Sequence, residues 1–94
     1  MPPVTLEFPN PSRSFDEVRN AVRFIGHDGM FEVPFFVEVE VLARSSAGLR
    51  RMELSEEMYL STFDSTRRSI EDVAREAYSH RRQTSYTLTV ADFR

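Results

Sequence analysis

The chain has 94 residues, 40% of them hydrophobic, so we expect one domain spanning residues 1–94 with a single modest core. It carries no apolar run long enough to span a membrane and no signal-like leader, and we therefore expect a cytoplasmic protein. The absence of cysteine excludes disulfides, thiolate metal ligands and a cysteine nucleophile.

The charge pattern argues mildly against a dedicated nucleic-acid binder, because the net charge is −3 and the pI is near 5.3. All twelve basic residues are arginine, whose planar guanidinium can hold phosphate or carboxylate through two hydrogen bonds. A GC-rich genome produces the same bias, and we favour that explanation. The doublets Arg50-Arg51, Arg67-Arg68 and Arg81-Arg82 keep weak nucleic-acid binding as an alternative, which the interleaved acidic residues disfavour.

The chain begins with a short strand pattern. Residues Val4–Phe8 alternate apolar and polar side chains, and Pro9–Ser12 ends that alternation with turn-forming residues. Ser14 and Glu17 then have the spacing of a capping box, which predicts a single helical turn over Phe15–Arg19. A longer helix that continues through Ile25 fits the same apolar spacing. We favour a strand at Ala21–Ile25 instead, because the later strand at Phe31–Val39 needs an antiparallel partner.

Strand patterns dominate the next segment. We predict a strand over Ala21–Ile25 and a hairpin loop over Gly26–Gly29, because Asp-Gly is a common turn dipeptide. Phe31–Val39 is the strongest strand, with alternate apolar residues on one face. The following Glu40–Arg44 fits either a continuation of that strand or a short helix.

The longest periodic segment, Leu54–His80, predicts an α-helix that Ser55 caps. Apolar residues recur at helical spacing along one face: Leu60, Phe63, Ile70, Ala74, Ala77 and Tyr78. On the solvent face, the i,i+4 spacing predicts these ion pairs: Asp64–Arg68, Arg68–Asp72 and Glu71–Arg75. A last strand is expected over Ser85–Val90.

Together these elements predict an α+β fold of two layers. Its first layer is a mainly antiparallel four-stranded sheet, and its second is the long C-terminal helix that covers one face of the sheet. The predicted element order is β-β-β-α-β with short helical turns, and the sequence does not predict the order of strands within the sheet.

The chain resembles a family of short bacterial proteins, the domain of unknown function 1488 (DUF1488), across most of its length. The matching residues are Phe8-Pro9-Asn10, Arg13-Ser14-Phe15-Asp16, Val22-Arg23-Phe24, Gly26-His27-Asp28, Glu32-Val33, Phe35, Phe63-Asp64, Arg67, Ile70, Ala74, Tyr78, Tyr86, Leu88 and Asp92-Phe93. The resemblance implies a compact α+β domain with a short helix after the third strand. It implies no catalytic residue, because no activity is assigned to the family.

A cluster of polar residues at the predicted hairpin is one candidate site. His27 could exchange a proton near neutral pH, Asp28 could orient it, and Arg23 could bind an anion. We favour the simpler interpretation that these are ordinary loop residues. Metal-dependent hydrolysis would need further His and Asp ligands, and the chain has only two histidines, so we expect no metal and no cofactor.

Arg67 is the second candidate, because it interrupts the apolar face of the long helix. A charge on such a face is costly unless it is paired or can reach water. We favour a structural ion pair, with Asp16 or another carboxylate as partner, over a contact with a bound anion.

The third candidate is an interface on the other face of the sheet, where Ile25, Met30 and Phe36 could form an exposed apolar patch. On this basis the favoured function is a non-enzymatic interaction or regulatory module that forms a homodimer. The alternative is a small enzyme or anion-binding protein that uses Arg23, His27 and Asp28.

Overall fold

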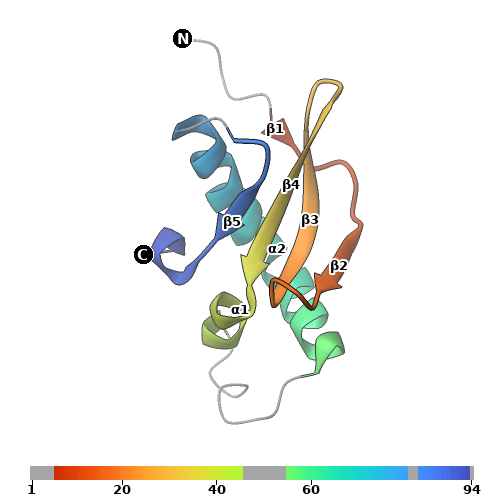
Figure 1. Cartoon of the computed structure of the whole chain (residues 1–94), viewed down its shortest axis with the longest axis vertical. Helices are drawn as coiled ribbons and strands as arrows, with labels where there is room; N and C mark the ends of the chain where they lie inside the picture. The colour runs from red at the N-terminus through yellow and green to blue at the C-terminus, as the bar shows by residue number, and fades with distance from the viewer. Residues whose placement is uncertain (1–5, 46–54, 81–82, 94) are drawn as a thin grey trace.

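The computed structural model describes residues 6–45, 55–80 and 83–93, which form a five-stranded sheet covered on one face by a long helix (Figure 1). The strands are β1 (Leu6–Glu7), β2 (Arg13–Asp16), β3 (Ala21–Asp28), β4 (Phe31–Glu38) and β5 (Tyr86–Leu88). The helices are α1 (Val39–Ser45), α2 (Glu56–His80) and the 3-10 helix η2 (Val90–Phe93). The predicted α+β class, with a mostly antiparallel sheet and a covering helix, is confirmed.

The strand order is β1-β3-β4-β5, and β2 also pairs with β3. All pairings are antiparallel except that of β4 with β5, which is parallel because the helical segment between these strands returns the chain to the same end of the sheet. The sheet therefore has one strand more than predicted.

The additional strand is β2, and the predicted helical turn over Phe15–Arg19 is wrong. Ser14 caps no helix and instead pairs with β3. The carboxylate of Asp16 accepts the backbone N–H of Arg19 at 3.0 Å, and Asn20 adopts a φ of 52°, a left-handed conformation that asparagine tolerates. The capping-box spacing is only a local signal, whereas the ladder to β3 provides hydrogen-bond partners along the whole strand.

The predicted hairpin joins β3 and β4, although its loop is shorter than expected. β3 continues to Asp28, which pairs with Phe31, so the loop contains only Gly29 and Met30. Gly29 adopts a φ of 63° at the first loop position, where a primed turn requires glycine-like freedom. The chain then enters α1 rather than extending the strand, because helical geometry buries Val41 and Leu42 against the rest of the core.

The long helix follows its predicted course. Ser55 lies before its first turn, and the Ser55 Oγ accepts the N–H of Met58 at 3.3 Å, which confirms the cap. Val4 and Leu54, at the starts of two predicted elements, lie outside the described residues. β5 is shorter than the predicted Ser85–Val90 strand because Val90 already belongs to η2. No helix among the described residues is long and apolar enough to cross a membrane.

An aromatic core lies between α2 and the sheet. The ring of Phe24 lies 5.4 Å from that of Phe35 and 5.0 Å from that of Phe63, and Phe35 stacks on Tyr86 at 5.1 Å. Phe24, Phe35 and Phe63 are fully buried. These ring contacts join β3, β4, β5 and α2, and they determine which face of each strand points away from the helix.

Candidate functional site

The face of the sheet turned away from α2, called the outer face below, holds most of the candidate residues. Successive residues of a strand point to opposite faces, so Arg23, Ile25 and His27 lie on the outer face while Val22 and Phe24 lie in the core. Both shorter helices, α1 and η2, contact α2. Among the described residues, no helix lies across the outer face (Figure 1).

The pairing register arranges the outer face in rows that run across the strands. We call them the basic, central and acidic rows. The basic row contains Ser14, Arg23, Phe36 and Thr87, the central row contains Ile25 and Pro34, and the acidic row contains Glu7, His27 and Glu32. An apolar centre is therefore flanked by arginine on one side and by two glutamates on the other. A fourth outer row, with Asp16, Ala21 and Glu38, lies beyond the basic row.

The structure does not bring the predicted polar cluster together. Asp28 follows His27 in β3 and points to the opposite face, where its carboxylate accepts the Tyr78 hydroxyl from α2. Arg23 and His27 share the outer face but lie four residues apart, roughly 13 Å along the strand. The carboxylate therefore cannot orient the imidazole, and the acid–base pair considered from the sequence is not assembled.

The predicted apolar patch is also altered, because its members do not form one exposed surface. Phe36 is only 5% exposed, since the guanidinium of Arg19 lies 4.4 Å from the centre of its ring. Met30 is 99% exposed, but it lies at the tip of the β3–β4 hairpin. Ile25 alone keeps its predicted place, half-buried in the central row.

Arg19 is held over Phe36 by Asp16. The Asp16 carboxylate accepts the backbone N–H of Arg19 and pairs with its guanidinium at 3.1 Å. These interactions, the backbone hydrogen bond first, hold the pKa of Asp16 below its usual value. The sequence contains no signal for this arrangement beyond the i,i+3 spacing of the two charges.

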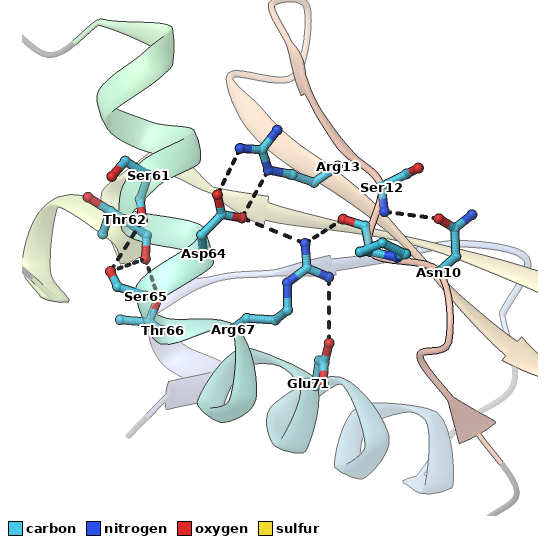
Figure 2. A network of polar contacts seen from close by, with 11 residues as sticks. Asn10, Ser12, Arg13, Ser61, Thr62, Asp64, Ser65, Thr66, Arg67 and Glu71 are labelled. Atoms are coloured by element: carbon cyan, nitrogen blue, oxygen red, sulfur yellow. Dashed lines mark hydrogen bonds and ion pairs between the residues drawn. The ribbon is translucent and has the colours of Figure 1, made fainter.

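Arg67 has structural partners, as favoured from the sequence, although Asp16 is not among them (Figure 2). Its guanidinium donates to the backbone carbonyl of Pro11 at 2.7 Å and lies 3.7 Å from both Asp64 and Glu71. It also lies 4.7 Å from the centre of the Phe63 ring. The side chain thus ties α2 to the segment before β2, and the two carboxylates offset its charge.

Arg13 completes this network from the side of β2 (Figure 2). Its Nε and Nη2 atoms donate to the two carboxylate oxygens of Asp64 at 2.9 and 2.7 Å, a two-pronged contact. The hydrogen bonds from Arg13, with a smaller contribution from Arg67, hold the pKa of Asp64 below its usual value. Asp64 therefore pairs across the fold with Arg13, whereas the sequence predicted Arg68 as its partner.

A separate cavity of about 250 Å³ lies between α2 and η2. It is lined by Val73, Glu76, Ala77, His80 and Asp92, and the His80 Nε2 lies 3.8 Å from the Glu76 carboxylate. Ala77 belongs to the apolar face predicted from the sequence, but the sequence did not indicate a cavity here, although the i,i+4 spacing of the helical residues was visible. No group of three His, Asp or Glu side chains within the described ranges could hold a metal ion.

Comparison with known proteins identifies a family without assigning an activity. The model of the family described as "Protein of unknown function (DUF1488)" matches residues 6–90. A crystal structure of a DUF1488 protein of unknown function from Shewanella loihica PV-4 has the same fold, with a TM-score of 0.77 at 16% identity. The match covers 94% of this chain and 96% of that one. No curated protein matches the chain. The chain belongs to the DUF1488 family.

Proposed function

We propose that this domain is a non-enzymatic interaction module that self-associates through the outer face of its sheet. The observation that carries the proposal is the central row, where Ile25 and Pro34 lie half-buried on a face that no described helix covers. Apolar residues gathered on a solvent-facing surface and rimmed by polar ones are typical of protein interfaces.

The position of Asp28 supports a binding function over an enzymatic one. Its carboxylate is engaged by Tyr78 on the core side of the sheet, so Asp28 does not orient His27 as a general base. The engagement of Arg67 by Pro11, Asp64 and Glu71 likewise favours a structural role for that residue.

Nucleic-acid binding gains no support from the arginine doublets. Only Arg67-Arg68 lies within the described residues, and the Arg67 guanidinium is already paired with carboxylates. Arg50-Arg51 and Arg81-Arg82 lie outside them. On the outer face, the acidic row would repel a phosphate backbone.

Light scattering after gel filtration tests the proposal directly. At several hundred micromolar the wild-type protein should have the mass of a dimer, and Ile25→Glu should be monomeric, because the new carboxylates would be desolvated in the contact. Ser79→Glu, at an exposed position on α2, is the matched control and should remain dimeric. Circular dichroism verifies that each variant is folded. A monomeric wild type at this concentration would refute the proposal.

Binding of a small anion at Arg23 is the second candidate. Ser12, Ser14 and Arg23 line a shallow hollow of about 80 Å³, and no carboxylate of the described residues forms an ion pair with Arg23. A guanidinium beside two hydroxyls suits phosphate or carboxylate. Titration with inorganic phosphate should shift the amide signals of Ser14 and Arg23 in the wild type and leave those of Arg23→Gln unchanged. Equal shifts in both proteins would exclude this site.

A further inference from the structure

We propose that two copies pack outer face to outer face, with their strands antiparallel, about a two-fold axis that runs along the central row. This inference rests on the self-association proposed above and adds the orientation of the partner. The molecule that covers the outer face is a second copy of this chain. When the strands of one copy run antiparallel to those of the other, the charges on the two sides of the central row complement each other.

The register provides this complementarity. In β3, Arg23 lies two residues before Ile25, and His27 lies two residues after it. Rotation about the central row places each strand over the same strand of the partner copy and reverses its direction. Arg23 of one copy therefore lies over the acidic row of the partner copy, between positions equivalent to Glu7 and Glu32. Because stacked sheets lie about 10 Å apart, a long arginine side chain can reach these carboxylates.

The opposite orientation is electrostatically unfavourable. An axis parallel to the strands would place each row over the same row of the partner. Arg23 of both copies would then face each other at one end of the interface, where Arg19 is already paired with Asp16, and Glu7 and Glu32 of both copies would face each other at the other end. Like charges brought together at an interface suppress such a pairing. The charge pattern therefore selects the antiparallel arrangement.

The same arrangement accounts for two exposed apolar side chains at opposite ends of β3. Val18, in the turn between β2 and β3, is 93% exposed, and Met30, at the hairpin tip, is 99% exposed. With the axis at Ile25, the hairpin tip of each copy lies over the β2–β3 turn of the other. Met30 and Val18 then contact across the interface at both ends.

The size of the face predicts a weak dimer. Strand spacings of about 4.8 Å and a rise of about 3.3 Å per residue give the outer face an area of roughly 500 Å² per copy. This is at the low end for specific interfaces, and it corresponds to micromolar rather than nanomolar affinity. Concentrations of several hundred micromolar are therefore appropriate for the experiments.

Charge reversal tests the complementarity. Arg23→Glu and Glu32→Arg should each weaken dimerisation about tenfold or more. A mixture of the two variants should recover most of the lost affinity, because each reversed charge then faces the opposite reversed charge of the other variant, and only Glu7 still faces a like charge. Glu57→Arg, on the exposed first turn of α2, is the control and should leave dimerisation unchanged. Single reversals that dimerise like the wild type would refute the proposed contacts.

Site-specific crosslinking tests the orientation, and the absence of native cysteine makes each introduced thiol unique. The spacing of stacked sheets exceeds the reach of a disulfide, so a short bismaleimide is the appropriate reagent. Met30→Cys alone should not crosslink, whereas a mixture of Met30→Cys and Val18→Cys should give a crosslinked dimer. If the wild type is a dimer and Met30→Cys crosslinks to itself, the proposed orientation is overturned but the self-association is not. A monomeric wild type would overturn both.

Discussion

Replacing Arg67 by alanine should lower the free energy of unfolding by about 2 kcal/mol. The hydrogen bond to the Pro11 carbonyl contributes about 1 kcal/mol, and the contact with the Phe63 ring about 0.5 kcal/mol. The ion pairs with Asp64 and Glu71 are long and partly exposed, and they add only about 0.2–0.4 kcal/mol each. These contacts are lost together in Arg67→Ala, because the single Arg67 side chain, which is only 22% exposed, makes all of them.

Urea unfolding followed by circular dichroism measures this loss. The midpoint should fall while the m-value stays constant, which indicates a change in stability alone. Arg68→Ala is the matched control, because Arg68 is the next residue of the same helix and its side chain is exposed. This substitution should change the free energy of unfolding by less than about 0.5 kcal/mol. The free energy of unfolding of Arg67→Lys should lie between those of Arg67→Ala and Arg68→Ala, because lysine keeps the charge but lacks the planar guanidinium. If Arg67→Ala were no more destabilising than Arg68→Ala, the network would not support the fold.

Further predictions concern acid stability and the core. The pKa of Asp64 is lowered in the folded state, chiefly by Arg13, so this pair stabilises the protein above the unfolded-state pKa and the contribution disappears as pH falls below about 4. The stability difference between wild type and Asp64→Asn should therefore shrink between pH 5 and pH 3; a constant difference would contradict the assignment. Gly26→Ala should destabilise by about 1–3 kcal/mol in urea unfolding, because its Cβ would lie 2.9 Å from Leu6 and Phe8 side-chain atoms. An unchanged or higher midpoint would show that both side chains can move aside.

The α+β class and the main elements could be predicted because their signals are local, and the family could be predicted because its matching residues run across most of the chain. The spacing of apolar residues in α2 and the cap at Ser55 act within a few turns of one helix. The alternation in β4 likewise follows from the geometry of a single strand. The β2 strand could not be predicted in this way, because a capping-box spacing at Ser14 competes with a ladder that forms only when β3 is already in place.

The candidate sites depended on partners that are distant in the sequence. Asp28 is engaged by Tyr78, 50 positions away, and Arg67 by Pro11, 56 positions away. Neither contact has a local signature in the sequence. The sequence therefore indicated that Arg67 needs a partner, but the partner could not be identified from it. The burial of Phe36 beneath Arg19 similarly depends on how the β2–β3 turn folds over the sheet.

The sequence by itself determined the periodic elements, the absence of cysteine chemistry and the need to compensate Arg67, since each follows from residue type and spacing. Only the tertiary structure decided which side chains share a face. The pairing register placed Arg23 on one side of Ile25 and aligned His27 with Glu7 and Glu32 on the other. Residues of different strands become neighbours only through hydrogen-bonded pairing, and a shift of one residue would move each of them to the opposite face.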